Sequence, residues 1–283
     1  MRKSLISTAV LGALLAPSFV FAADAAPAPD LTVAYNVGLY SQYIFRGLTQ
    51  TNRQPALQGG IDLTHSSGFY LGGWGSSISW LKEKVGTTQS DPAVYTAGGS
   101  LELDIYGGYR HTFDQIGSGL GIDIGALQYW YPGTLRAGAS GANTTEVYGA
   151  LTYGWLQGKI STVVSEDAWG FGKEYNANSG GDDERGTYYA ELNANIPLAD
   201  TGITALIHVA RQEFNNAKVT RTGPAASYTD WKLGLTKAFD NGISVGAYYT
   251  DTNISKANAA DNWTYAGKNI GDATGTVFVQ KTF

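Results

Sequence analysis

Apolar and polar residues alternate along most of the chain, in segments of about ten residues. In one segment, Leu101, Leu103 and Ile105 share one face, while Glu102 and Asp104 share the other. Successive side chains of a β-strand point to opposite faces, so this period of two predicts strands and not helices. The pattern predicts about twelve strands, near residues 33–46, 55–65, 68–80, 99–111, 119–131, 145–155, 158–167, 186–197, 202–213, 228–239, 242–252 and 273–283.

One segment breaks the alternation. In 119–131 the apolar face switches between Ile124 and Leu127. An extra residue in one strand of a pair produces such a switch, so the sequence predicts a β-bulge there.

The connections between these segments alternate in length. The short ones lie near 65–68, 156–158, 197–202 and 239–242, and 111–118 belongs with them by position. The long, polar ones lie near 47–54, 81–98, 132–144, 168–185, 214–227 and 253–272. Short turns on one side and long loops on the other are typical of an outer-membrane barrel. The predicted fold class is therefore all-β, a transmembrane antiparallel up-and-down β-barrel of about twelve strands.

The first residues have the pattern of a secretory signal peptide. Arg2 and Lys3 precede a short apolar run, and small residues near Ala22 offer a cleavage site. A single membrane anchor is the alternative, but the apolar run is short for a spanning helix. The predicted organisation is a signal peptide at 1–22, a spacer rich in Ala and Pro at 23–32, and an outer-membrane β-barrel at 33–283.

Composition narrows the function classes. Only 15% of the 283 residues are charged, against roughly 25% in soluble domains. With no Cys, the chain has no disulfide framework and no thiolate metal ligand. A net charge of -5 without a basic run argues against nucleic acid as a partner. No phosphate-binding loop, dinucleotide fingerprint or zinc motif is present, so we expect neither a cofactor nor a metal.

A secreted β-sandwich would also alternate, but three features favour a membrane barrel. The apolar faces carry almost no charge, and the exceptions Lys237 and Lys281 fall near strand ends, where long side chains reach the interface. The strands are long enough to cross a bilayer when tilted. Aromatic residues lie at strand ends, where two interfacial girdles are expected: Tyr43, Phe45, Trp80, Tyr129, Trp130, Tyr131, Trp155, Trp231 and Phe239. The expected partner is the lipid bilayer of a Gram-negative outer membrane.

The last strand ends on Phe283, with Val277 and Val279 at alternate positions before it. This resembles the terminal signature by which the barrel-assembly machinery recognises outer-membrane proteins. Lys281 departs from that signature, which usually has an apolar or aromatic side chain there.

Several short motifs resemble those of one family. They are SQYIFRGLTQT at 41–51, PALQG at 55–59, GFYLG at 68–72, WGS at 74–76, ELD at 102–104, DIG at 123–125, YWYPG at 129–133 and TEVY at 145–148. Together they resemble the TorF-like family of proteobacterial outer-membrane porins. The resemblance covers most of the chain, most strongly before residue 155. It implies an outer-membrane location and passive passage of small solutes, and it supplies no catalytic residues.

If the apolar faces contact lipid, the opposite faces line the lumen. The candidate lumen-lining residues are Arg46, Asp62, Glu102, Asp104, Arg110, Asp123, Glu146, Lys159, Glu191, His208 and Lys232. About twelve strands leave a narrow passage at most, since eight give a filled interior and sixteen to eighteen an aqueous channel. We therefore expect a channel for small polar solutes. The alternative is a non-conducting barrel with a structural or surface-binding role.

Arg46 has two interpretations. It could be a fixed cation at the pore mouth that attracts anionic solutes. The favoured interpretation is a structural ion pair with an inward carboxylate such as Asp62 or Glu102.

Some barrels of this size are lipid hydrolases, which need a nucleophile within hydrogen-bond reach of a base. The chain has three histidines. His65 and His111 fall on short turns, and His208 faces the lumen with Ala210, not Ser, as its neighbour on that face. We therefore expect no catalytic residue, and His208 is predicted to be a hydrogen-bonding group of the lumen.

Overall fold

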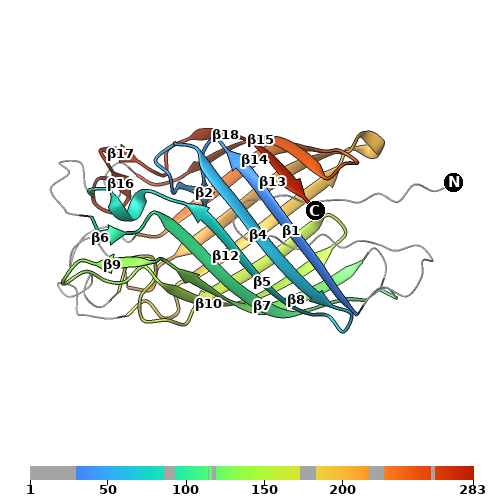
Figure 1. Ribbon diagram of the computed structural model, residues 1–283, viewed down its shortest axis with the longest axis horizontal. Coiled ribbons are helices and arrows are strands. Elements are labelled where there is room, and N and C mark those ends of the chain that lie inside the picture. Colours follow the sequence, from blue (N-terminus) through green and yellow to red (C-terminus); the bar gives the residue numbers. More distant parts are fainter. Residues whose placement is uncertain are drawn as a thin grey trace.

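The computed structural model describes residues 30–85, 93–113, 115–116, 119–172, 183–216, 226–255 and 259–283. Within them, twelve antiparallel strands close into a barrel (Figure 1). These strands are β1 (Leu31–Tyr40), β4 (Ala56–His65), β5 (Phe69–Ser77), β7 (Leu101–Phe113), β8 (Leu120–Trp130), β10 (Thr144–Tyr153), β11 (Leu156–Val163), β12 (Tyr188–Pro197), β13 (Ile203–Glu213), β14 (Tyr228–Ala238), β15 (Ile243–Thr252) and β18 (Thr274–Thr282). Neighbours in the barrel follow chain order, and β1 closes the ring by pairing with both β4 and β18. The predicted all-β antiparallel barrel is confirmed.

The two ends of the barrel differ. At one end, which we call the turn end, β1 begins, β18 ends and the short connections lie (Figure 1). At the other end, the loop end, the long connections gather with several short elements. These smaller elements are β2 (Ile44–Phe45), β3 (Leu48–Thr49), β6 (Tyr95–Gly98), β9 (Gly133–Leu135), β16 (Thr264–Tyr265), β17 (Lys268–Asn269), the 3-10 turn η1 (Trp80–Lys82) and the π turn η4 (Ala259–Trp263). A second 3-10 turn, η3 (Ala199–Thr201), lies in the short connection between β12 and β13 at the turn end. No helix in the described residues is long and apolar enough to cross a membrane.

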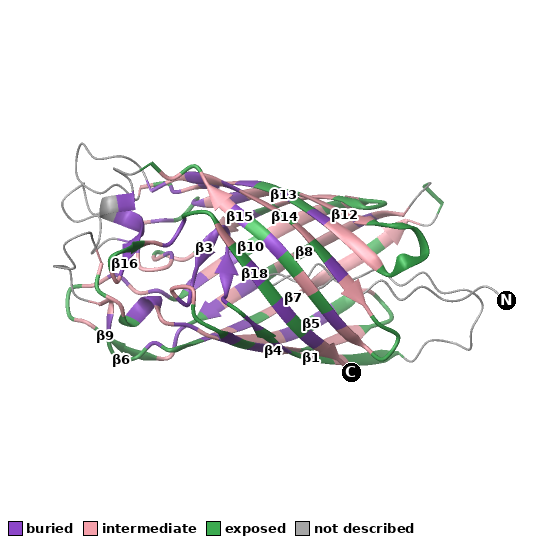
Figure 2. Cartoon of the chain, turned by 90° about the horizontal axis from the view of Figure 1, so that it is seen from above, coloured by how far each residue is buried: buried purple, intermediate pink, exposed green. Residues whose placement is uncertain are grey.

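Exposed positions alternate with less exposed ones along much of each long strand, as expected when successive side chains point outward and inward. Figure 2 shows these positions as bands of different burial along the strands. On β1, Leu31, Val33 and Leu39 are each about half exposed, whereas Tyr40 is buried inside. An apolar outer surface with polar residues inside is the reverse of a water-soluble protein, and it is stable where the outer surface contacts hydrocarbon. An exception is the ion pair between Arg211 and Glu213, which lies on the outside at the loop end of β13.

The predicted bulge in 119–131 is wrong. β8 keeps an unbroken register with β7 and with β10. Ile124 is 56% exposed and faces outward, while Leu127 is 2% exposed and faces inward. The apolar face does not switch. Leu127 is apolar although it points inward, because it lies in a part of the barrel interior that excludes water.

The first predicted strand, 33–46, is too long. β1 ends at Tyr40, and the chain then turns into the barrel as a hairpin made of β2 and β3. Arg46 and Gly47 form its tip, with φ angles of 46° and 80°. The alternating pattern extends past Tyr40 because the hairpin is itself extended backbone. The segment 47–54, predicted as a long outer loop, therefore lies partly inside.

The aromatic residues at strand ends divide into two groups. Trp130, Trp155 and Phe239 lie on the outside and are about half exposed, as a girdle requires. The prediction is wrong for those that are buried inside the loop-end half, which are Tyr43, Phe45, Trp80, Tyr129 and Tyr131. These belong to an apolar cluster that forms the core of this barrel. A strand-end aromatic can face either way, because its parity along the strand decides its side.

Candidate channel lumen and its constriction

A plug hairpin, residues 42–51, crosses the lumen at the loop end. Gln42 donates to the Thr274 hydroxyl of β18 at 2.8 Å and to the carbonyl of Gly275. The Tyr43 hydroxyl donates to Glu102 of β7 at 2.6 Å. Three strands that are distant in the sequence hold the hairpin, because the Tyr228 hydroxyl of β14 also donates to the Arg46 carbonyl, at 2.8 Å.

Arg46 is the charged centre of this plug. Its Nη2 lies 2.7 Å from Glu146 Oε2, and its Nη1 donates to Gln212 at 2.9 Å. The guanidinium also lies over the rings of Phe45, Trp169 and Tyr189, at 4.9, 4.9 and 4.3 Å from the centroids. The predicted ion pair exists, but Asp62 and Glu102 are the wrong partners: the hairpin carries Arg46 across the lumen to β10.

The charge of Arg46 persists despite its burial. Burial, the largest single effect, lowers the pKa of the guanidinium, but the charge and hydrogen bond of Glu146 together with the nearby Tyr129 and Tyr189 raise it by more, and the pKa lies above its ordinary value. A cation this deep is stable only with a paired anion and donated hydrogen bonds. The pair therefore ties the fixed cation of the hairpin to the barrel wall.

Carboxylates cluster on the other side of the hairpin. Glu102 and Asp104 are neighbours on the inner face of β7, and both are buried. Asp104 Oδ1 and Glu146 Oε1 are enclosed without a hydrogen-bond partner in the described part of the chain. With Tyr43 and Tyr129, 1% exposed each, they form a layer that closes the lumen in this structure.

Below this layer, toward the turn end, charged residues alternate with tyrosines. The Tyr106 hydroxyl donates to Asp62 at 2.6 Å. Asp123 stands opposite Arg110 in the register of β7 and β8, and it accepts a hydrogen bond from Tyr70 at 2.6 Å. The Arg110 guanidinium lies 3.9 Å from the centre of the Tyr70 ring. Paired charges therefore line this side of the lumen.

The opposite wall holds a second network. Lys159 stands opposite Glu191 in the register of β11 and β12. His208 Nδ1 lies 2.6 Å from Asn193 Oδ1, and its Nε2 lies 3.1 Å from Asp230 Oδ1. Lys232 faces His208 across β13 and β14, and its Nζ lies 5.3 Å from the centre of the Tyr248 ring.

All eleven candidate residues from the sequence lie inside the barrel, at two depths. Arg46, Glu102, Asp104 and Glu146 are buried in the closed layer, and His208 is also buried. Six others are intermediate in exposure although they face inward: Asp62, Arg110, Asp123, Lys159, Glu191 and Lys232. Sequence reasoning missed Trp169 beside Arg46, because Trp169 lies on a loop whose position the strand pattern does not encode.

The interior offers little for catalysis or metal binding. The hydroxyl that contacts His208 belongs to Tyr189, at 3.0 Å, and the next inward residue on its strand is Ala210. His65 contacts Ser67 at 2.7 Å, but this is a local bond across an exposed turn. Among the described residues, no group of three or more His, Cys, Asp or Glu could hold a metal ion.

A family model described as "bacterial protein of unknown function (Gcw_chp)" matches residues 24–283. The chain belongs to this family. Membership of the TorF-like family stays a prediction. Among curated proteins, no sequence matches significantly.

Solved structures match the chain only at low sequence identity and with TM-scores below 0.5. The KdgM porin has a TM-score of 0.47 and 9% identity, with 89% of this chain and 98% of that chain covered. The NanC porin also gives 0.47 and 9%, with 88% and 98% covered. The outer membrane phospholipase A from Escherichia coli gives 0.40 and 12%, with 88% and 95% covered. Likenesses of this size carry no argument about function.

Proposed function

We propose that this Gcw_chp protein is an outer-membrane channel for passive diffusion of small polar solutes. The observation that carries the proposal is the inner surface toward the turn end, where charged residues of both signs keep intermediate exposure. Buried charge is costly, so a barrel with a purely structural role has no need of so many charged residues on its inner face. The apolar outer surface supports a position in the bilayer, because exposed leucine and isoleucine side chains are stable in hydrocarbon.

The expected location is the outer membrane of a Gram-negative cell, after removal of the signal peptide near Ala22, a segment outside the described residues. The loop end then faces the exterior and the turn end the periplasm. Recognition by the barrel-assembly machinery through the last strand fits the position of Phe283. Its ring stacks on Tyr35 of β1 at 5.1 Å, at the seam that closes the barrel.

The plug hairpin sets the size limit of the channel. A solute that enters from the loop end meets the layer formed by Arg46, Glu102 and Glu146 before it reaches the open half. We expect passage to require a shift of the hairpin, because the side chains of this layer are buried. Below it, charges of both signs can replace part of the hydration of a polar solute, and the solute diffuses on without a coupled energy source.

The closed layer itself favours a second candidate, a non-conducting barrel that presents its loops for a structural or surface-binding role. In that case the ion pair between Arg46 and Glu146 would keep the lumen closed at all times. The two candidates differ in what happens when the hairpin is removed.

Conductance in a planar lipid bilayer tests the proposal. We expect small single-channel steps for the wild-type protein and larger steps when residues 42–51 are replaced by a short Gly-Ser linker. The matched control is Leu233→Ala on the lipid-facing side, which should leave the step size unchanged. If neither the wild type nor the hairpin deletion shows steps while both migrate as folded barrels on gels, the channel proposal is wrong and the structural role is favoured.

A further inference from the structure

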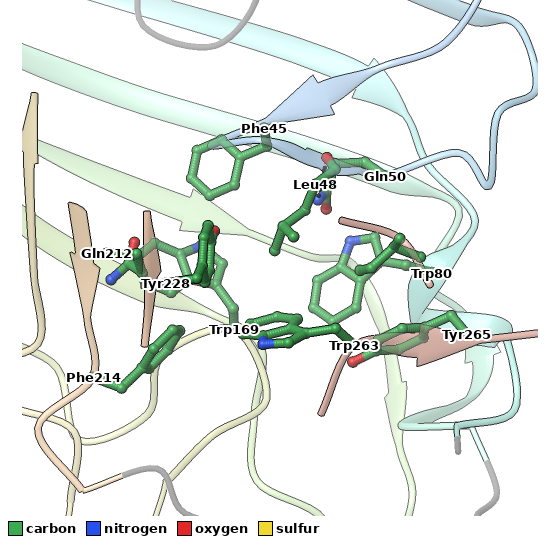
Figure 3. A pocket seen from close by; sticks show the side chains of 11 residues that line it. Phe45, Leu48, Gln50, Trp80, Trp169, Gln212, Phe214, Tyr228, Trp263 and Tyr265 are labelled. Atoms are coloured by element: carbon green, nitrogen blue, oxygen red, sulfur yellow. Dashed lines mark hydrogen bonds between the residues drawn. The ribbon is translucent and has the colours of Figure 1, made fainter. Parts of the chain in front are cut away.

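An aromatic pocket lies at the loop end, directly above the plug hairpin (Figure 3). It has an empty volume of about 420 Å³, open solvent at its mouth included. Seven of its eleven lining residues are aromatic, among them Trp80, Trp169, Phe214 and Trp263. No lining residue is charged. The described loops therefore build a ring-lined recess where a solute from outside would first meet the barrel.

The wall chemistry selects a flat, mostly apolar ligand. Neighbouring rings lie at angles that offer both faces and edges: Trp263 and Tyr228 are T-shaped at 5.4 Å, and Phe214 and Trp263 are tilted at 5.9 Å. An aromatic ring gains from such surroundings beyond the area that it buries. A sugar does not fit as well, because each of its hydroxyls needs a partner and the polar groups of the lining are few: the amides of Gln50 and Gln212, two phenols and the indole N–H groups.

The unpaired donor groups of the pocket wall require a hydrogen-bond acceptor on the ligand. The indole nitrogens of Trp80 and Trp169 have no hydrogen-bond partner in the described part of the chain. An indole N–H only donates, so its partner must be an acceptor. The Arg46 guanidinium lies 4.9 Å from the centre of the Trp169 ring, on which it already makes a cation–π contact. Because Glu146 lies 2.7 Å from this guanidinium, the pair adds no net charge beside the pocket.

From the aromatic wall and the two unpaired indole donors we infer that the aromatic pocket binds a small, single-ring aromatic molecule that carries a hydrogen-bond acceptor, such as a carbonyl or carboxylate oxygen. This inference rests on the proposed function in one respect: it takes the ligand of the pocket to be the solute that the channel admits. Phe45, Leu48 and Gln50 of the pocket wall belong to the plug hairpin. A ligand in this pocket thus contacts the segment that has to move for passage.

Calorimetric titration of the purified protein in detergent tests the pocket. The three probes are benzoate, cyclohexanecarboxylate, which keeps the carboxylate acceptor but lacks the π system, and benzyltrimethylammonium, which keeps the ring but has no hydrogen-bond acceptor. We expect benzoate to bind about threefold or more tightly than cyclohexanecarboxylate, the range that aromatic pairing supplies. Benzyltrimethylammonium should bind most weakly.

Variants locate the binding. Trp263→Ala should weaken benzoate binding about tenfold, whereas Trp155→Ala on the outside of the barrel should not change it. Trp169→Phe keeps an aromatic ring and removes only the N–H donor, so it should lower benzoate affinity in a barrel that remains folded on gels. Equal binding of the two acids, tighter binding of the ammonium probe, or unchanged binding in Trp263→Ala would overturn the inference. If the protein shows channel steps but does not bind benzoate, the pocket inference is wrong and the channel proposal stands. If it binds benzoate but no variant shows channel steps, the channel proposal is wrong and the pocket inference stands.

Discussion

The Arg46 guanidinium lies 2.7 Å from the Glu146 carboxylate, although the two residues are 100 positions apart in the sequence. Their side chains are 3% and 1% exposed. This pair joins the tip of the plug hairpin to the wall of β10. Because both charges are out of water, neither can lose its partner without leaving an uncompensated charge in the closed layer.

Glu146→Ala is therefore expected to destabilise the barrel by about 3–5 kcal/mol, the usual consequence of removing one partner of a buried pair. Urea unfolding from lipid vesicles, followed by tryptophan fluorescence, measures this loss. The control is Glu213→Ala, which breaks the half-exposed pair with Arg211 on the outside and should cost about 0–1 kcal/mol. Similar losses in both variants would contradict a structural role of the Arg46 pair.

Gly47→Ala should displace the plug hairpin. Gly47 has a φ of 80°, and a Cβ there would lie 2.6 Å from the Cβ of Asp230. The left-handed conformation alone costs a side chain about 1–2 kcal/mol, and the clash adds to it. We expect lower stability and a larger single-channel conductance. Gly149→Ala is the control, since its Cβ would meet nothing within 4 Å and it should change neither quantity. Wild-type conductance in Gly47→Ala would argue against the hairpin as the constriction.

Charge placed on the outer surface should disrupt membrane insertion. Ile124 faces outward near the middle of β8 and is 56% exposed. Ile124→Arg should reduce folding stability in vesicles by about 2–4 kcal/mol, because the guanidinium would enter hydrocarbon. The inward Thr152→Arg should be tolerated far better. If both arginine variants fold equally well into vesicles, the outer surface does not contact lipid.

The lumen should prefer cations. Among the described residues, its inner face carries seven carboxylates against four permanent cations: Asp62, Glu102, Asp104, Asp123, Glu146, Glu191 and Asp230 against Arg46, Arg110, Lys159 and Lys232. An excess of fixed negative charge raises the local concentration of cations. Reversal potentials in a KCl gradient should show a modest cation preference.

Two variants check the origin of this preference. Glu191→Gln should weaken it and Lys159→Gln should strengthen it, because the two residues face each other in the same part of the lumen. An anion preference in the wild type that disappears in Arg46→Ala would instead make Arg46 the selectivity residue.

The strands of this barrel could be predicted closely from the sequence. The alternating pattern predicted a strand over 242–252, and the structure has β15 at Ile243–Thr252. Lipid is a uniform surrounding, so every outward position needs an apolar side chain and parity along a strand reveals its side. For the same reason the inward direction of Asp62 or Lys159 follows from the sequence alone.

Contacts across the barrel depended on the tertiary structure. Parity shows that Glu146 points inward, but it does not show that a hairpin 100 residues earlier carries Arg46 to it. The same limit applies to the aromatic pocket, where Trp80, Trp169 and Trp263 meet from three separate loops. The alternation of apolar and polar residues indicates only whether each side chain faces lipid or the barrel interior. Ring closure and the inward turn of the chain after Tyr40 decide which distant residues become neighbours, and these depend on the packing of the whole barrel.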